Sequence, residues 1–191
     1  MKKQFILFTS SIAIACYAMF SMSSCTKLAK NLQYDLDMQT ATVDITIPPC
    51  LDTTVAVAGT QSANYNIDSF IKANTANVLG VSNITSAKIQ SCVLEIQQTS
   101  TSEFNNFANF KSVSASLHTD KNLTPYTLKI DNNPDVYSLS LSVPVDPNAE
   151  LKGYLNNGNM FTYTLGGSLR RKTTDTIHCK ATITFKVHVQ G

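Results

Sequence analysis

Three histidines, His118, His178 and His188, are the side chains of this 191-residue chain that could act as bases near neutral pH or bind a transition metal. His178 and His188 are ten residues apart on one alternating segment, and a β-strand would separate them by about 33 Å. His118 ends another such segment on its polar side, where a solvated side chain is the simpler interpretation. The histidines therefore predict neither a shared metal site nor a catalytic base.

Sequence motifs of nucleotide-binding proteins, serine hydrolases and zinc proteases (the P-loop, GxGxxG, GxSxG and HExxH) do not occur. Paired catalytic carboxylates would have to converge in a cleft. The candidate carboxylates fall instead in an expected tether, a turn and a helix start: Asp35 and Asp37, Asp131 and Asp135, and Glu150. We therefore expect no enzymatic activity, no cofactor and no metal.

Five cysteines divide into two groups. Cys16 and Cys25 lie at the N-terminus, whereas Cys50, Cys92 and Cys179 lie in the body of the chain, without the spacing of a zinc site. These three cysteines could form one disulfide and leave one free thiol, and their spacing does not reveal which two would pair. Cys179 lies on the apolar side of an alternating segment and is expected to be an inert core thiol.

The N-terminus has the pattern of an export signal. Lys2 and Lys3 precede an apolar run from Phe5 to Phe20, and small residues lead directly to Cys25. This junction resembles the lipobox of bacterial lipoproteins, in the relaxed form of some Gram-negative groups because Met22 replaces the usual leucine. The resemblance implies a signal peptide over 1–24, acylation of Cys25 and a tether over 25–40. An uncleaved membrane helix is the alternative, since residues 5–22 approach the minimum spanning length.

Cleavage after residue 24 would remove two lysines and no acid, which leaves 13 basic and 13 acidic residues. A neutral chain does not suit nucleic acid, because phosphate binding needs clustered cations. The dense basic stretch Arg170-Arg171-Lys172 is interpreted as a solvated hairpin end. The resemblance to lipoproteins with relaxed lipoboxes implies that export to the cell surface would need an acidic run directly after the cysteine. Residues 26–30 contain no acidic residue. We therefore expect an outer-membrane anchor on the periplasmic face.

Alternation with period two dominates the body of the chain and predicts about eight half-buried strands. The clearest is 177–189; the others are 43–47, 55–57, 84–96, 113–117, 126–130, 137–143 and 161–165. Gly166-Gly167 is interpreted as a bend or bulge. One-sided alternation predicts antiparallel sheets that pack into a sandwich over 41–191.

Three short helical segments are expected between the strands. One is capped by Asp146 with Pro147 at its first position, and a second spans Asn66 to Ala73. The third is a stripe formed by Phe104, Phe107 and Phe110, which is interpreted as a plug that closes the sandwich rather than as a ligand site. Together these features predict an antiparallel, immunoglobulin-like β-sandwich with short helical crossovers, although the Cys-Trp-Cys framework of true immunoglobulin domains is absent.

The order of elements resembles small bacterial lipoproteins with one immunoglobulin-like sandwich. The likeness covers about residues 55–189 and rests on these segments: Ile67-Asp68-Ser69-Phe70-Ile71, 84–96, 106–110, 112–118, Leu151-Lys152-Gly153-Tyr154-Leu155 and Thr184-Phe185-Lys186-Val187. These are packing and turn motifs. The resemblance therefore implies a fold and a location but no chemistry.

Two functions are consistent with these features. The first is a non-enzymatic envelope module that scaffolds or binds another protein through loops or an open sheet edge. The second is a carbohydrate-binding accessory lipoprotein of a glycan-uptake system. The chain has no Trp, and Tyr126, Tyr137 and Tyr163 fall on apolar phases that predict core positions. A solvent-exposed pair of aromatic residues at one face or loop end would favour the carbohydrate-binding function. An unfilled interior would favour a third possibility, an apolar ligand held between the sheets.

Overall fold

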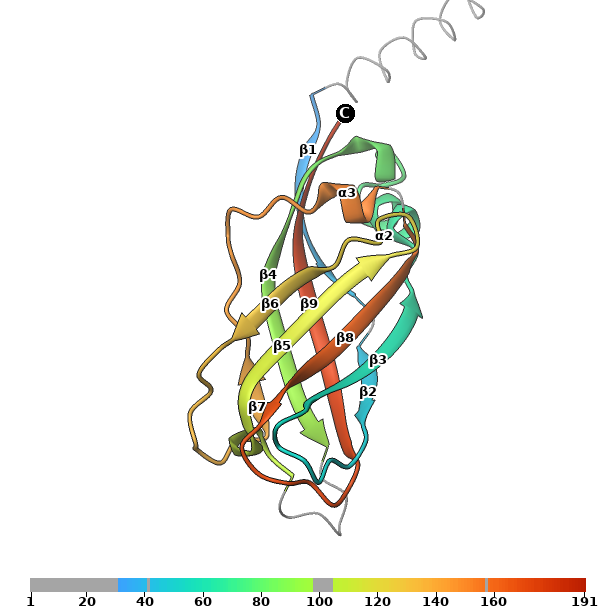
Figure 1. Cartoon of the computed structure of the whole chain (residues 1–191). Coiled ribbons are helices and arrows are strands. Elements are labelled where there is room, and N and C mark those ends of the chain that lie inside the picture. The colour runs from blue at the N-terminus through green and yellow to red at the C-terminus, as the bar shows by residue number, and fades with distance from the viewer. Residues whose placement is uncertain (1–30, 41, 98–104, 157) are drawn as a thin grey trace, which may run out of the picture.

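The computed structural model describes residues 31–40, 42–97, 105–156 and 158–191. It contains two antiparallel sheets. The first sheet contains β1 (Gln33–Gln39), β2 (Val43–Ile47), β4 (Ile84–Gln97), β7 (Ser140–Ser142) and β9 (Ile177–Gln190). The second contains β3 (Ala56–Asn64), β5 (Phe110–Thr119), β6 (Tyr126–Ile130) and β8 (Met160–Leu169). Figure 1 shows the two sheets packed face to face, so the expected antiparallel β-sandwich is confirmed.

The strand order adds a detail that alternation does not reveal. In the first sheet β9 pairs with β1 and β2 on one side and with β4 on the other, and β4 pairs with β7. The second sheet has the order β3-β8-β5-β6. Two sheets of order β2-β9-β4-β7 and β3-β8-β5-β6 form the double Greek key of a jelly roll. The immunoglobulin-like expectation therefore holds for the sandwich, and the connectivity is that of a jelly roll.

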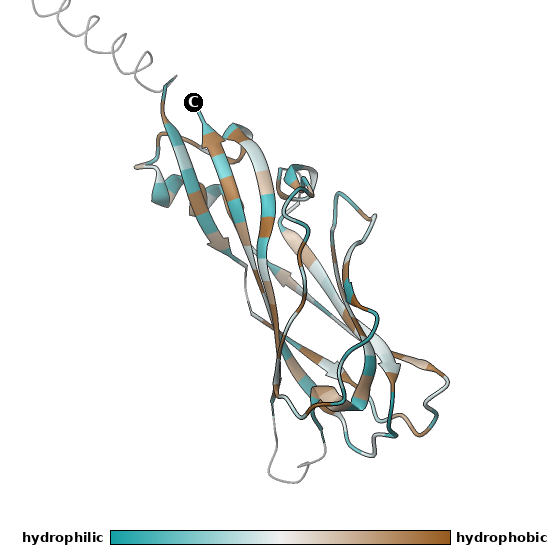
Figure 2. Cartoon of the chain, turned by 90° about the vertical axis from the view of Figure 1, so that its left-hand side faces the viewer, coloured by the Kyte–Doolittle hydropathy of each residue, from teal (hydrophilic) through white to brown (hydrophobic). Residues whose placement is uncertain are grey.

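The core lies between the inner faces of the two sheets. On β9 every odd-numbered residue from Ile177 to Val189 is buried, as the alternation predicted. The same alternation of apolar and polar residues is visible along the strands in Figure 2. Each fully buried aliphatic or aromatic side chain contributes about 1.5–3 kcal/mol, so this strand stabilises both sheets.

The end of the sandwich where β1 begins and β9 ends is closed by helices (Figure 1). Helix α2 (Ile67–Asn74) is confirmed close to its expected bounds, because Asn66 caps it by accepting a hydrogen bond from the Ser69 amide at 2.9 Å. The side chains of Ile67 and Ile71 are fully buried. Apolar residues therefore close this end.

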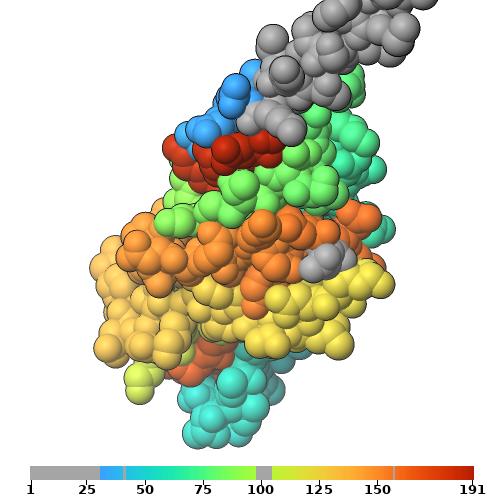
Figure 3. Space-filling view, turned by 90° about the horizontal axis from the view of Figure 1, so that it is seen from above, coloured from blue at the N-terminus to red at the C-terminus, as the bar shows by residue number. Residues whose placement is uncertain are grey.

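Helix α3 (Lys152–Leu155) also lies at this end but begins later than expected. Asp146 does not cap it; its carboxylate accepts a hydrogen bond from the Asn148 amide in a local turn. Figure 3, which views this end from above, shows the segment around α3 (orange) between β4 (green) and the β5–β6 region (yellow). The Tyr154 hydroxyl donates to the Thr124 carbonyl at 2.8 Å, which fixes α3 to the β5–β6 connection.

Two further expectations need correction. Residues 33–39, assigned to the tether, form β1, which pairs with β9 from Gln33–Gln190 to Gln39–Thr184. Gly166 and Gly167 form no bend or bulge, since they continue the regular pairing of β8 with β3 and β5. A Cβ atom on Gly167 would lie 2.0 Å from the Ser112 carbonyl oxygen, so this glycine permits a close approach of the two strands.

Candidate functional site

A polar depression of about 540 Å³ lies at the end of the sandwich opposite α2 and α3. Three connections line it: β4–β5, which contains the 3-10 turn η2 (Phe107–Asn109), then β6–β7, and finally β8–β9. The volume falls in the range of small-molecule sites. We call this depression the loop-end pocket.

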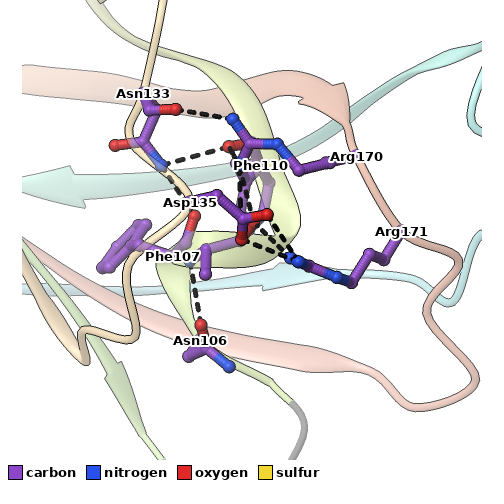
Figure 4. Close-up of polar contacts among 8 residues, drawn as sticks. Asn106, Phe107, Phe110, Asn133, Asp135, Arg170 and Arg171 are labelled. Atoms are coloured by element: carbon purple, nitrogen blue, oxygen red, sulfur yellow. Dashed lines mark hydrogen bonds and ion pairs between the residues drawn. The ribbon is translucent and has the colours of Figure 1, made fainter.

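The Arg170 guanidinium holds the three connections together. It donates to the carbonyl oxygens of Ala108 at 2.8 Å, Phe110 at 3.2 Å and Asn133 at 2.7 Å (Figure 4). Ala108 belongs to the β4–β5 connection, Phe110 is the first residue of β5, and Asn133 belongs to the β6–β7 connection, while Arg170 follows β8. The wall of the pocket is therefore cross-linked by charge-assisted hydrogen bonds, which are stronger than neutral ones.

Arg171 lies beside it and forms the charged rim. Its guanidinium donates to both carboxylate oxygens of Asp135, at 2.7 and 2.6 Å, and to the Ala108 carbonyl at 2.9 Å. Hydrogen bonding from Arg171, aided by the positive charges of Arg171 and Arg170, lowers the pKa of Asp135. The expectation of a solvated basic hairpin end holds for Arg171 and Lys172, which are exposed, whereas Arg170 is half-buried. Sequence reasoning missed that both guanidinium groups donate to backbone carbonyls of neighbouring segments.

Beneath the pocket the aromatic plug is confirmed for the part of the stripe that the structure describes. Phe107 and Phe110 are buried, with ring centroids 6.0 Å apart, and Phe104 lies outside the described residues. The buried Asn133 amide donates to the carbonyls of Phe107 and Phe110. The plug thus supports the floor, and Asn133 fixes its backbone.

Buried polar residues gather at this end. Among the described residues eight polar side chains are buried, and five of them belong here: Asn105, Asn106, Asn109, Asn133 and Thr173. Thr173 also pairs with Cys50 through two backbone hydrogen bonds of 3.0 and 2.9 Å, which ties the β2–β3 connection to the pocket. Buried polar groups need partners, so the pocket has a defined rather than a loose polar lining.

Tyr137 corrects the sequence expectation most directly. It was predicted to be a core residue, but its side chain is 59 % exposed and lines the loop-end pocket. Tyr163 is buried as predicted and Tyr126 is half-buried. An exposed aromatic residue therefore lies beside a polar pocket.

The histidines are placed as the sequence predicted. His178 and His188 lie on the outer face of β9, near its first and last residues respectively, and His118 lies on β5 in the other sheet. His188 contacts Asp35 at 2.8 Å, and this hydrogen bond lowers the pKa of Asp35. No group of three or more metal-binding side chains was found within the described residues.

The three cysteines of the body of the chain are free thiols. Cys92 and Cys179 are buried, and burial raises the pKa of each to about 12. Cys50 is half-buried and donates to the Asp52 carbonyl. The expectation of an inert core thiol at Cys179 fits this burial, and the disulfide alternative is not realised.

Cys25 and the signal segment 1–24 lie outside the described residues. None of the helices in the described part of the chain has the length and apolar character needed to cross a membrane.

Comparisons with known proteins give distant structural likeness. Neither a family model nor a curated protein matches the chain. Among solved structures it is similar to the infectious bursal disease virus VP2 subviral particle, with a TM-score of 0.40 and 10 % identity over 83 % of this chain. The chain spans 33 % of that protein's length.

Two further capsid structures are similarly distant. The BFDV capsid protein has a TM-score of 0.36 and 9 % identity, and the match covers 84 % of this chain and 95 % of that one. The Macrobrachium rosenbergii nodavirus particle has a TM-score of 0.33 and 7 % identity, and the match covers 84 % of this chain and 85 % of that one. Likeness at this level carries no argument, so the function of this chain has to be argued from its own residues.

Proposed function

We propose that the protein is a lipid-anchored, non-enzymatic binding module of the bacterial envelope. In this proposal Cys25 carries the acyl chains, the protein lies on the periplasmic face of the outer membrane, and the loop-end pocket receives the partner. The observation that carries the proposal is the placement of this polar pocket opposite the end where β1 begins.

The length of the segment after Cys25 and the length of β9 are consistent with a loop-end pocket that faces away from the membrane. Seven residues separate Cys25 from Gln33, so the start of β1 lies within about 30 Å of the anchoring sulfur even when this segment is fully extended. Strand β9 has 14 residues and extends for about 45 Å toward the other end. An anchored sandwich would therefore hold its far end tens of ångströms from the lipid, where a periplasmic partner can reach it.

The anchor is tested by replacing Cys25 with alanine. The unmodified protein should incorporate labelled fatty acid and partition into detergent, and the Cys25→Ala protein should do neither. A Cys25→Ala protein that stays acylated and membrane-bound would refute the anchor.

The binding end is tested by photo-crosslinking in intact envelopes. A photoreactive residue at the exposed Thr174, on the β8–β9 connection of the pocket, should give specific adducts. The matched control is Leu123, which is 72 % exposed on the β5–β6 connection at the opposite end. Adducts from position 123 and none from position 174 would show that the partner binds elsewhere.

A further inference from the structure

The ligand class of the loop-end pocket follows first from its charges. Arg171 and Lys172 contribute two positive charges to the lining, and Asp135 and Asp175 contribute two negative charges. The Asp135–Arg171 pair is already joined by two short hydrogen bonds. A strongly charged ligand would meet a lining without net charge and would have to compete with this ion pair, so the pocket suits a neutral polar ligand.

The buried lining residues give the polar chemistry. Asn105, Asn106 and Asn109 are 4, 8 and 7 % exposed and all line the pocket. A side-chain amide carries both donors and an acceptor, as each sugar hydroxyl also does. Their positions are fixed locally; for example, Asn106 accepts a hydrogen bond from the Ala108 amide at 2.9 Å. Held amides of this kind fit a ligand with many hydroxyl groups.

Tyr137 gives the apolar contact that such a ligand needs. A pyranose ring has apolar C–H faces between its hydroxyls, and an exposed aromatic ring offers a flat apolar surface with a polar tip. Tyr137 lines the same pocket as the three asparagines and comes from a different connection. The polar and apolar requirements of a sugar therefore meet in one pocket.

We propose that the loop-end pocket binds a neutral glycan, with Tyr137 as the stacking platform and the surrounding amides as hydrogen-bonding partners. The proposal rests on the proposed function of this end as the binding end, and it names the ligand class. It assigns no chemical step, since a glycan would be bound and not altered.

The test measures binding of cello-, xylo-, manno- and maltohexaose by calorimetry, with polygalacturonate as the charged comparison, to the anchored protein in detergent. At least one neutral oligosaccharide should bind, and Tyr137→Ala should weaken that binding about tenfold or more, as expected for an aromatic residue at the centre of a contact. Tyr137→Phe keeps the ring and should retain affinity within about threefold. Val136→Ala changes an exposed neighbour outside the lining and should have no effect.

Unfolding curves of the four proteins verify that each is folded. Absence of binding to every neutral oligosaccharide, preference for polygalacturonate, or equal binding by Tyr137→Ala would overturn the glycan proposal. Protein adducts from position 174 without glycan binding would overturn the glycan and leave the binding function standing. Neither adducts nor glycan binding would overturn both.

Discussion

Replacing Gly167 by alanine should destabilise the sandwich, although glycine-to-alanine changes at unstrained positions stabilise proteins by about 0.4–1 kcal/mol through the unfolded chain. The difference lies in the space around this residue. A Cβ atom at position 167 would be 2.0 Å from the carbonyl oxygen and 3.0 Å from the carbonyl carbon of Ser112. Both are backbone atoms of β5, so no side-chain rotation can relieve the clash.

The magnitude follows from the shift that is needed. Restoring an ordinary contact requires β5 and β8 to separate locally by about 1 Å, beside the register shift between Phe110 and Ser112. Overpacking of this kind costs about 1–3 kcal/mol, and weakened ladder hydrogen bonds add about 1 kcal/mol each. After the gain from the unfolded chain is subtracted, we expect a net loss of about 2 kcal/mol or more, which lowers Tm by roughly 4–8 °C in a domain of this size.

The assay is urea unfolding of the detergent-purified protein, followed by circular dichroism. Gly153→Ala is the matched control, because Gly153 is exposed in α3 and the nearest atom to its Cβ position is the Asn122 side-chain nitrogen at 3.9 Å. This control should be neutral or stabilised by about 0.5 kcal/mol. If both variants shift stability in the same direction, the argument from close strand approach is refuted.

Three other perturbations test the packing of charges and thiols. Arg170→Met removes the donors of three backbone carbonyls and should lower the free energy of unfolding by about 2 kcal/mol. Arg171→Met removes an exposed ion pair and should lower it less. Equal losses for the two variants in denaturant unfolding would contradict this expectation. The thiols of Cys92 and Cys179 ionise more readily in the unfolded chain than in the folded protein, where burial raises the pKa of each to about 12. Their protonated forms therefore stabilise the folded state fully below pH 9, and this stabilisation is lost between pH 9 and about 12. Replacing both cysteines by alanine should make the free energy of unfolding decline less steeply over this pH range. Burial raises the pKa of Glu150, but hydrogen bonds from Ser86, Ala87 and Lys152 outweigh it and leave the pKa lowered, so Glu150→Gln should weaken the loss of stability as pH falls below 4.5.

Alternation predicted the strands well where burial on one face extends over many residues. Strand β9 has seven inward residues and was located almost to the residue. Strand β1 was missed because only Leu36 and Met38 of its seven residues are buried, and acidic residues flank Leu36. Its stability comes from hydrogen bonding along β9, which a local pattern does not reveal. Sheet order was also out of reach, since alternation says which face is buried but not which strands are neighbours.

The candidate site was harder to predict than the fold. Tyr137 continues the alternation of Leu139, Leu141 and Val143, yet β7 covers only Ser140–Ser142 and the chain before it is a loop. The alternating pattern of the sequence therefore continues beyond the strand itself, which is why Tyr137 was wrongly predicted to be a core residue. The segment 106–110 was expected to be a turn, and it contains the 3-10 turn η2. What the sequence did not reveal is that Arg170 and Asn133, from distant parts of the chain, bind the backbone carbonyls of this segment.

The two ends of the sandwich differ in a way that bears on function. The helical end is closed mainly by apolar side chains, including Ile67, Ile71, Leu151 and Leu155, and it buries two threonines, Thr75 and Thr119, but no asparagine of the buried polar set. The loop end has an equally effective apolar plug in Phe107 and Phe110, but above it the chain buries polar groups. Burying a polar group costs free energy unless it is hydrogen-bonded, and at best the exchange with water contributes about 1 kcal/mol. Closing the sandwich alone does not require this polar layer, whereas positioning donors and acceptors for a ligand does.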